Sequence, residues 1–418
     1  MVIERAKGTR DFLPEESIIR EKIIGTIKKT FEKFGFSPLE TPIIEKYEIL
    51  ASKYTGGSEI LKETFKLKDQ GNRELGLRYD LTVPLARIVA MNPQLKMPFK
   101  RYEIGEVFRD GPTKLGRYRQ FTQCDADIVG TKSMLADAEC IKLIQEVFDN
   151  LKINITIEVN NRKILDSILD YLKIEQEKRE SVIIAIDKIK KLGLDEVKKE
   201  IKNMGIEEDK IMGMIKIFSI KGSNKRKIEA IKNIVECEGV LEIEKVLNNV
   251  NDKNVEFNVS LARGLSYYTG TVFEVFAKNK EVNVAIAGGG RYDKMIGNLI
   301  ENREVPAVGI SFGLDPILDI MKTKKTKRTV TKVYVIPINN IKKAIQVVDK
   351  LRKEGINADM DLMERGISKN LDYANSLNIP YVIFVGEKEL KKKKIKLRDM
   401  KTGKEKLVNI KTAIKILK

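Results

Sequence analysis

The chain of 418 residues contains no histidine and no tryptophan. The absence of histidine excludes a His-metal site, a Ser-His or Cys-His nucleophile system and an imidazole general base. Any catalysis must therefore use arginine, lysine, carboxylates, amides, phenols or groups of the substrate itself.

Cysteine is scarce, with only Cys124, Cys140 and Cys237 in the chain. An odd count without CxxC spacing argues against a disulfide framework or a zinc ribbon and favours a reducing cytosol. No run approaches the ~18 apolar residues of a membrane span, and the N-terminus, charged from Glu4, lacks the apolar segment of a signal peptide. The sequence predicts a cytoplasmic protein without membrane contact.

Positive charge, in contrast, is abundant. Lys and Arg number 78 against 60 Asp and Glu, a net charge of +18. Residues 331–418 alone hold 21 Lys and Arg against 10 Asp and Glu, a net charge of +11. This surplus favours a polyanionic partner such as a nucleic acid. The alternative is a lysine-rich proteome in which surface Lys and Glu are simply common, and charge alone does not distinguish the two.

The length predicts roughly two to three domains, and apolar periodicity divides the chain accordingly. Helices are expected at 17–35, 84–91 and 134–151, a strand at 75–83, and an antiparallel hairpin from 99–109 and 118–129. From 162 to 250 the pattern is helical and rich in Lys and Glu, which predicts an inserted helical domain. Strands are expected again at 153–159, 255–260, 271–277, 282–287 and 307–312, the last followed by a helix from 313.

Residues 322–331 are polar and aperiodic, which is typical of a linker. Beyond them, strands alternate with helices, at 333–338, 340–354, 357–360, 368–377 and 381–385. This alternation predicts a small α/β domain with a mostly parallel sheet.

The hairpin carries a polar face. Since side chains alternate along a strand, Phe121, Gln123, Asp125 and Asp127 share one side of it. An amide and two carboxylates each need a partner when buried, so this face predicts the floor of a pocket that binds a cationic or donor-rich ligand. The alternative is a solvated strand face.

Arginines surround the same hairpin, at Arg109, Arg117 and Arg119. Forked guanidinium donors suggest phosphate binding. The alternative is that these arginines pair with Asp110 or Asp125 at the surface.

Two glycine-containing segments lie further along the chain. Residues 261–270, LARGLSYYTG, combine Arg263 with two tyrosines whose hydroxyls suit a ring nitrogen, although a structural turn is the alternative. Residues 287–293, AGGGRYD, allow close approach of a ligand to the backbone or turns with positive φ. No GxxxxGK[ST] sequence is present, so the cluster is not a P-loop. Taken singly, each signal is weak.

Taken together, five segments resemble the histidyl-tRNA synthetase family in its archaeal form, over essentially the full length. In chain order they are KGTRDFLPEE at 7–16, RYDLTVPLAR at 78–87, FRDGPTKLGRYRQFTQCDADIVG at 108–130, ARGLSYYTGTVFE at 262–274 and GGGRYD at 288–293. The pattern ARGLxYYTG is the most specific of these, because it is peculiar to this family and its paralogues.

The resemblance implies an α+β fold: a class II synthetase antiparallel sheet flanked by helices, a helical insertion domain and a C-terminal α/β anticodon-binding domain. Motif 1, which builds the dimer interface of the class, corresponds to 35–44, motif 2 to 99–128 and motif 3 to 307–318. The implied domains are catalytic 1–160 and 253–321, insertion 161–252, linker 322–331 and anticodon-binding 332–418.

The resemblance also assigns a histidine site. Asp80, Thr82 and Gln123 would hold the substrate α-ammonium group, while Asp127 and Tyr268 would take the two imidazole nitrogens. This division suits neutral imidazole, which presents one donor and one acceptor. The remaining members of the histidine-binding set are Leu81, Arg109, Arg263 and Tyr267.

For catalysis the resemblance implies two arginines. Arg109 would contact the α-phosphate of ATP and the histidine carboxylate, and Arg263 would stabilise the charge that develops on that phosphate. Arg117 would join both in binding ATP, which acts with Mg²⁺, and no protein ligand of the metal is assigned. In the second step the adenylate's own phosphate oxygen would accept the proton of the tRNA 3′-hydroxyl.

The chain departs from the family pattern at three positions. Pro316 replaces the arginine with which motif 3 of the class normally ends, and Gly111 replaces a glutamate near adenine. Ser266 stands where the family commonly has Asp. Arg117 or Arg291 is a candidate substitute for the missing nucleotide contacts.

The expected function is that of a homodimeric histidine–tRNA ligase with L-histidine, ATP and tRNA(His) as substrates. The alternative is a non-catalytic, histidine-sensing paralogue, the regulatory subunit of ATP phosphoribosyltransferase. That paralogue typically lacks the anticodon domain and loses motif 2 and histidine-loop residues, whereas this chain retains Arg109, Gln123, Arg263 and Tyr268.

Overall fold

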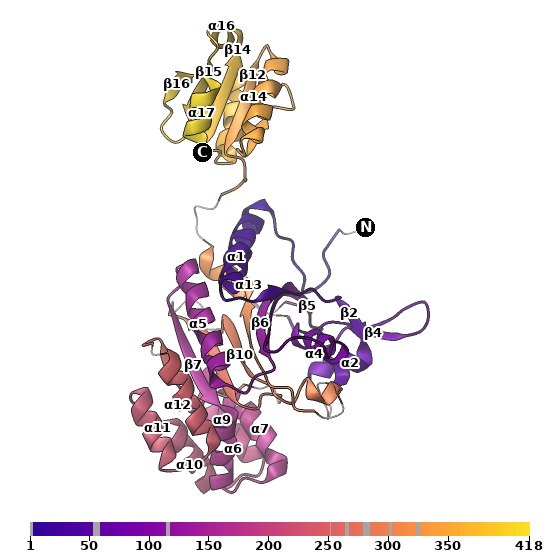
Figure 1. Cartoon of the computed structure of the whole chain (residues 1–418), viewed down its shortest axis with the longest axis vertical. Helices are drawn as coiled ribbons and strands as arrows, with labels where there is room; N and C mark the ends of the chain where they lie inside the picture. Colours follow the sequence, from indigo (N-terminus) through magenta and orange to yellow (C-terminus); the bar gives the residue numbers. More distant parts are fainter. Residues whose placement is uncertain are drawn as a thin grey trace. The chain divides into compact units, whose positions relative to one another are not determined.

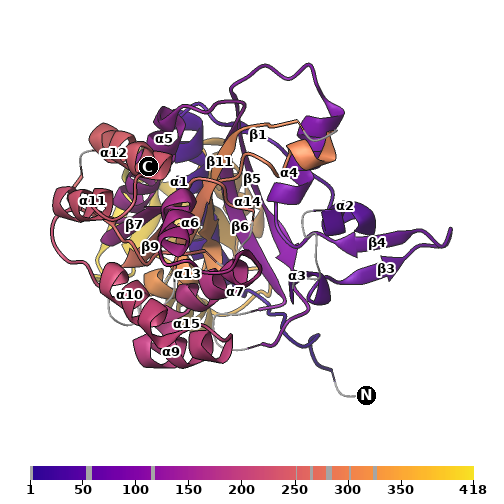
Figure 2. The same ribbon diagram turned by 90° about the horizontal axis from the view of Figure 1, so that it is seen from below.

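The computed structural model describes residues 3–52, 59–113, 118–250, 252–263, 267–278, 285–300, 303–322 and 327–418 (Figures 1 and 2). The chain forms two compact units. The larger contains Met1–Arg10 and Ile23–Met321, and the smaller contains Asp11–Lys22 and Lys322–Lys418. No helix among the described residues is both long and apolar enough to cross a membrane.

An eight-stranded sheet forms the centre of the larger unit. Its strands are β1 (Ser37–Pro38), β5 (Phe99–Phe108), β6 (Gln120–Val129), β7 (Ile155–Asn161), β8 (Val255–Phe257), β9 (Thr271–Ala277), β10 (Ala287–Arg291) and β11 (Ala307–Gly313). The order is β1-β5-β6-β11-β10-β9-β7-β8. The six inner strands are antiparallel, but β1 and β8 run parallel to their neighbours. The predicted α+β class is confirmed, and the sheet is mixed rather than purely antiparallel because of its two edge strands.

Helices cover one face of this sheet. They are α1 (Pro14–Lys33), from Ile23 onward, and α5 (Met134–Leu151). The ring of Phe312 on β11 packs between Phe31 of α1 and Phe148 of α5, with ring centroids 5.7 Å apart in both pairs. The predicted helices at 17–35 and 134–151 are confirmed, and their packing leaves the opposite face of the sheet for polar side chains.

The strand predicted at 75–83 is shorter than expected. β4 (Glu74–Leu77) ends early, and α4 (Thr82–Met91) begins at the threonine. The cause is Asp80, whose Oδ1 accepts hydrogen bonds from the backbone N–H groups of Thr82 at 3.1 Å and Val83 at 2.9 Å. Such a side chain satisfies the first free donors of a helix and fixes where it begins.

A second, three-stranded sheet consists of β2 (Ile44–Lys46), β4 and β3 (Lys66–Lys68), in that order. The short helices α2 (Tyr47–Ser52) and α3 (Glu59–Lys62) lie between β2 and β3 in the chain. Figure 2 shows β3 and β4 projecting on the side away from the helices of residues 194–250, which are described next.

The segment predicted to be helical, 162–250, is helical. Its helices are α6 (Arg162–Tyr171), α7 (Gln176–Asp187), α8 (Ile189–Leu192), α9 (Leu194–Asn203), α10 (Glu208–Phe218), α11 (Asn224–Lys232) and α12 (Glu238–Val250). It leaves the sheet after β7 and returns as β8, the parallel neighbour of β7. The segment is therefore an insertion at one edge of the sheet, with apolar cores of its own.

The glycine cluster forms a strand rather than a turn. Part of the strand predicted at 282–287 lies outside the described residues, and β10 begins at Ala287 and is buried along its length. A Cβ atom at Gly289 would overlap the carbonyl oxygen of Gly309 on β11. The backbones approach more closely here than side chains allow, so glycine is required. The unit closes with a 3₁₀ turn, Gly297–Leu299, and α13 (Leu314–Met321).

The smaller unit contains a five-stranded sheet of β12 (Val333–Ile338), β13 (Ala358–Met360), β14 (Tyr381–Gly386), β15 (Ile395–Asp399) and β16 (Glu405–Val408), ordered β13-β12-β14-β15-β16. Its helices are α14 (Ile341–Lys353), α15 (Ile367–Ser376), α16 (Glu387–Lys391) and α17 (Ile410–Leu417). β13, β12 and β14 are parallel as predicted. The antiparallel pair β15 and β16 was not predicted, because lysines obscure the short alternation of buried Ile395 and Leu397.

Candidate functional site

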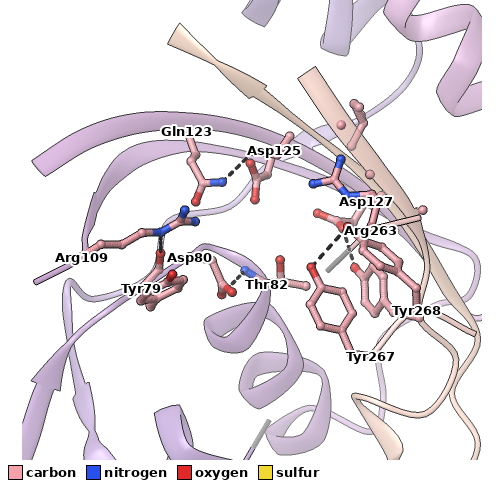
Figure 3. A pocket seen from close by; sticks show the side chains of 17 residues that line it. Tyr79, Asp80, Thr82, Arg109, Gln123, Asp125, Asp127, Arg263, Tyr267 and Tyr268 are labelled. Carbon is pink, nitrogen blue, oxygen red and sulfur yellow. Dashed lines mark hydrogen bonds between the residues drawn. The ribbon is translucent and has the colours of Figure 1, made fainter. Parts of the chain in front are cut away.

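A polar cavity of about 150 Å³ lies on the face of the large sheet that α1 and α5 leave uncovered (Figure 3). Strands β6, β10 and β11 form its floor, and the segment before α4, the end of β5 and the segment before β9 supply its walls. The lining residues are Tyr79, Asp80, Thr82, Arg109, Gln123, Asp125, Asp127, Arg263, Tyr267, Tyr268, Gly288, Gly289, Gly290, Tyr292, Gly309, Ile310 and Ser311.

The polar face of the hairpin forms part of the floor. Gln123, Asp125 and Asp127 of β6 all line the cavity, so the predicted alternation is confirmed and the face is not a solvated one. Strand register places Asp125 between Glu103 on β5 and Ser311 on β11. Three neighbouring strands thus contribute polar groups to one row.

Glycines on the adjoining strands make room for the functional side chains. A Cβ atom at Gly309 would overlap Oδ1 of Asp127, and one at Gly288 would overlap Nη1 of Arg263. Any larger residue would displace the carboxylate or the guanidinium group. The glycines therefore act in the site through the space that they leave.

One end of the cavity combines a carboxylate with three phenols. The Tyr292 hydroxyl donates a short hydrogen bond to Oδ1 of Asp127, and Nη2 of Arg101 lies 2.9 Å from the Oδ2 atom. The hydroxyls of Tyr267 and Tyr268 are 3.3 Å apart, with ring centroids 4.5 Å apart. Burial raises the pKa of Tyr267 and of Tyr292, so both phenols are neutral. This end suits a flat polar ring with one donor and one acceptor.

At the other end, an arginine is held between aromatic rings. The guanidinium carbon of Arg109 lies 4.2 Å from the ring centroid of Tyr79 and 4.9 Å from that of Phe121, and its Nε donates to the Tyr79 carbonyl at 3.4 Å. Stacking fixes the plane of the group, which suits forked binding of an anion. Nearby, Nε2 of Gln123 donates to Oγ of Ser311 at 2.8 Å, which orients the amide.

Arg263 supplies a second cation. Its side chain is 19 % exposed, and Nη1 donates to the Phe273 carbonyl at 3.3 Å and lies 3.7 Å from Oε1 of Glu274. Burial lowers the pKa of Arg263, but Tyr268 and Glu274 outweigh burial and the net shift is upward. The group therefore keeps its charge throughout the accessible pH range.

Asp125 is buried, with 3 % of its surface exposed, and its Oδ1 has no hydrogen-bond partner among the described residues. Burial raises the pKa of Asp125 to about 8; the charge of Asp127 adds to the rise, while Arg101 and a hydrogen bond from Ser311 oppose it. Without a ligand, the carboxyl group is largely protonated at neutral pH.

This pKa predicts a pH-dependent effect of Asp125→Asn on stability. Between pH 4 and pH 8 the folded chain retains a proton that the unfolded chain releases, so this group makes stability fall as pH rises. Asparagine imitates the protonated acid and removes the fall. We expect the variant's melting temperature to equal that of the parent near pH 4 and to exceed it by at least ~2 °C at pH 8. A constant difference across this range, measured by differential scanning calorimetry, would contradict the assignment.

The cavity gathers most of the residues expected at the histidine site, namely Asp80, Thr82, Arg109, Gln123, Asp127, Arg263, Tyr267 and Tyr268. Leu81 is not among the lining residues; its side chain is buried and its carbonyl accepts a hydrogen bond from Arg101 at 3.0 Å. Arg117 and Ser266 lie outside the described residues. Arg291, a candidate substitute, does not line the cavity and is bound to Asp137 and Asp293.

The other two departures from the family pattern have new neighbours. Asp315, just before Pro316, forms an ion pair with Arg10, whose guanidinium group lies 4.5 Å from the ring centroid of Tyr118. A Cβ atom at Gly111 would lie 2.5 Å from Oε1 of Glu63. Side chains from distant parts of the sequence therefore occupy the surroundings of both positions.

Sequence reasoning missed several contributors. It gave no role to Tyr79, Ser311 or Tyr292, although Tyr292 lies within the quoted segment GGGRYD. It also passed over Arg101, a fully buried arginine whose charge compensates the acidic floor. The signal for Arg101 was its alternation with Glu103 in a strand otherwise rich in apolar residues.

The comparisons with known proteins agree on one family. A family model described as histidyl-tRNA synthetase matches residues 8–317, and one described as an anticodon binding domain matches residues 332–418. Histidine--tRNA ligase 1 of Bacillus cereus is 44 % identical over 415 residues, 97 % of each chain. Histidine--tRNA ligase of Clostridium tetani is 40 % identical and covers 98 % of this chain and 97 % of its own.

Solved structures agree. The crystal structure of histidyl-tRNA synthetase from Nostoc sp. superposes with a TM-score of 0.88 at 30 % identity, covering 100 % of this chain and 99 % of the other. These relatives are bacterial, so the expected archaeal form is not supported.

Proposed function

Because the chain belongs to the histidyl-tRNA synthetase family, we propose that its polar cavity binds L-histidine with the α-phosphate of ATP beside it. The chain is a histidine–tRNA ligase, which activates L-histidine with ATP to histidyl-adenylate and transfers histidine to the 3′ end of tRNA(His), releasing AMP and diphosphate. The histidine-sensing paralogue is not favoured, because the anticodon binding domain is present. The observation that carries the proposal is a cavity with an arginine at one end and a carboxylate among phenols at the other.

The imidazole ring binds at the Asp127 end. Asp127 accepts from the N–H of the ring, and the Tyr268 hydroxyl donates to the other nitrogen. Arg101 and Tyr292 hold the carboxylate in place, as their contacts with it indicate. A carboxylate and a neutral phenol together recognise both nitrogens of the neutral imidazole, one as a donor and the other as an acceptor. An apolar ring of the same size would leave both protein groups without a hydrogen-bond partner from the ligand.

The backbone end of histidine lies toward Arg109. Asp80, Thr82 and Gln123 bind the α-ammonium group, and Asp80 has its orientation fixed by the N-terminus of α4. Arg109 binds the carboxylate of histidine together with the α-phosphate. Stacking against Tyr79 and Phe121 keeps the guanidinium plane between these two anions.

Activation is an in-line displacement at phosphorus. A carboxylate oxygen of histidine attacks the α-phosphorus, the bond to the bridging oxygen breaks, and diphosphate leaves with the electron pair. The attacking oxygen carries no proton, so no base is required. Arg263 and Arg109 are the catalytic residues, because they place positive charge where the phosphate oxygens gain negative charge.

The nucleotide tail requires further cations. Pro316 cannot contribute a positive charge, but Arg10 forms an ion pair with the neighbouring Asp315 and so brings a guanidinium group to this position. We assign Arg10 to this part of the site, together with Arg117 from the hairpin loop. Mg²⁺ would enter bound to ATP and would neutralise charge on its phosphates. Among the described residues, no group of three or more acidic or cysteine side chains is placed to hold a metal ion.

Transfer to tRNA follows without an imidazole base. The 3′-hydroxyl of tRNA attacks the carbonyl carbon of the adenylate, and its proton passes to a phosphate oxygen of the departing AMP. The composition is consistent with this route, because the chain has no histidine to act as a base. The cationic groups near the phosphate then serve both steps.

The tRNA contacts extend over further domains. We propose that 332–418 reads the anticodon, with a net charge of +11 over 331–418 to neutralise phosphates. The catalytic domain comprises 1–160 and 253–321, with 161–252 as an insertion and 322–331 as a linker. The enzyme acts in the cytoplasm as a homodimer through residues 35–44, where exposed Ile43 (42 %) and Ile44 (51 %) support an interface.

Charging of tRNA tests the whole proposal. With ATP, Mg²⁺ and labelled L-histidine, the purified chain should convert a tRNA(His) transcript to histidyl-tRNA and leave a tRNA with another anticodon and acceptor stem uncharged. Failure to charge tRNA(His), with the protein shown to be folded, would contradict it.

A further inference from the structure

Asp125 occupies the middle of the polar floor, between the two ends assigned above. On β6 it lies two residues from Gln123, at the Arg109 end, and two from Asp127, at the imidazole end. Two residues of an antiparallel strand span about 6.8 Å, so Asp125 lies one such step from each end of the row. Figure 3 shows the carboxyl group of Asp125 pointing into the space between its two neighbours.

The acceptors in this middle region lack donors. Oδ1 of Asp125 and Oε1 of Gln123 are both buried, and neither has a hydrogen-bond partner among the described residues. A buried acceptor without a donor is destabilising, so such a pair indicates a ligand that supplies donors. Ser311, the polar neighbour on β11, already binds both side chains.

The charge of the region specifies what the ligand carries there. The groups around Asp125 are Glu103 and Arg101 on β5, Asp127 on its own strand, Asp80 before α4, and the phenol of Tyr267. Arg101 faces several of these carboxylates, while Arg78 is bonded to Glu103. A cation added at this point is attracted by more acids than bases.

We propose that Asp125 is a further histidine-binding residue, which accepts a hydrogen bond from the α-ammonium group and ionises as that group binds. This inference rests on the proposed function and adds a residue to its site. Oδ1 of Asp80 already accepts hydrogen bonds from two backbone N–H groups. Asp80 therefore offers the α-ammonium group its negative charge but fewer acceptor positions. Asp125 supplies a carboxylate oxygen that no described residue satisfies.

Ionisation on binding has a measurable consequence. Because burial raises the pKa of Asp125 to about 8, the group is protonated at pH 7 until the ammonium ion arrives. Histidine binding at pH 7 should therefore release about one proton. The release declines above pH 8, where the carboxyl group is already ionised without ligand.

The test uses the full chain in isothermal titration calorimetry with three ligands: L-histidine, histidinol, which lacks the carboxylate, and imidazole-4-propionate, which lacks the α-amino group. Asp125→Asn should weaken the binding of L-histidine and of histidinol by about 10- to 100-fold. The affinity for imidazole-4-propionate should change by less than about twofold. Asp166→Asn, which removes a half-exposed partner of Arg162 in the insertion, is the matched control and should change none of the three.

Proton release is measured by repeating the histidine titration at pH 7 in buffers of different ionisation enthalpy. The parent chain should release a proton and Asp125→Asn should not. Equal weakening of all three ligands, unchanged histidine affinity, or the absence of proton release in the parent chain would each overturn the role of Asp125. If the parent chain fails to bind L-histidine at all, the proposed function fails instead. The absence of release in the parent chain would count against the proposal even where the variant does not fold.

Discussion

Replacing Arg263 by alanine should lower the rate of histidine-dependent ATP–pyrophosphate exchange about 1,000-fold while the KM for histidine changes by less than about threefold. The reason is the position of its charge. Arg263 lies in the cavity wall beside Tyr268, and Gly288 leaves the space that its guanidinium group fills. Its attraction for phosphate oxygens increases as they gain charge, so the transition state depends on it more than the bound substrate does.

Two controls accompany this variant. Arg263→Lys keeps the charge without the forked donors, so its exchange rate should lie between those of Arg263→Ala and the parent chain. Arg179→Ala removes an arginine of matching exposure, 18 % against 19 %, that also faces a carboxylate but lies in the inserted helices. It should leave exchange unchanged. An undiminished rate in Arg263→Ala would contradict the catalytic role of Arg263.

Removing residues 322–418 should reduce kcat/KM for tRNA charging at least about 1,000-fold while ATP–pyrophosphate exchange stays within about threefold. The deleted part contains the whole basic sheet domain, with its net charge of +11 over 331–418. The cavity is built from residues 79–311 and loses none of its lining. Steady-state charging and exchange assays of the same preparation separate these two steps.

The deletion also removes contacts with the N-terminal part of α1, and a point variant of the full-length chain controls for the loss of one of them. Within the smaller unit, Arg328 and Lys322 form ion pairs with Glu15 and Glu16 of α1. Full-length Arg328→Ala loses one of these pairs and keeps the domain, so it should charge tRNA normally. Efficient charging by the deleted chain would show that this domain does not contribute to tRNA recognition.

Much of the site was readable from the sequence because it depends on alternation within single strands. The period of two placed Gln123, Asp125 and Asp127 on one face, and the structure puts all three in the cavity. The hairpin itself followed from the short separation of two apolar runs, and β5 and β6 pair over their full length.

What the sequence did not reveal depends on contacts between distant segments. Arg10 meets Asp315 over 305 positions of the chain, whereas Arg101 lies directly opposite Asp127 on the paired strands β5 and β6. No local pattern encodes the first pair, and the second follows only from the exact register of the hairpin. The same holds for the glycines of β10, for which the sequence predicted close approach of a ligand or turns with positive φ. They form a buried strand, and they must be glycine because Gly309 and the side chain of Arg263 leave no room for a Cβ atom.

The boundary between β4 and α4 shows a related limit. The run LGLRYDLTV has the apolar content of a strand, and the prediction therefore extended it to Val83. A single carboxylate decides otherwise, since Asp80 captures the N–H groups of Thr82 and Val83 and starts the helix. Local hydrogen bonding by an aspartate outweighed the apolar pattern.

We propose that the cavity activates histidine and no other amino acid, and ATP–pyrophosphate exchange measures this selectivity. The full chain is incubated with ATP, Mg²⁺ and labelled pyrophosphate, with each of the standard amino acids in turn. We expect rapid exchange with L-histidine and a rate at least about 1,000-fold lower with every other amino acid, because none of them satisfies both Asp127 and Tyr268. Exchange with a different amino acid at a comparable rate, or none with histidine, would contradict it.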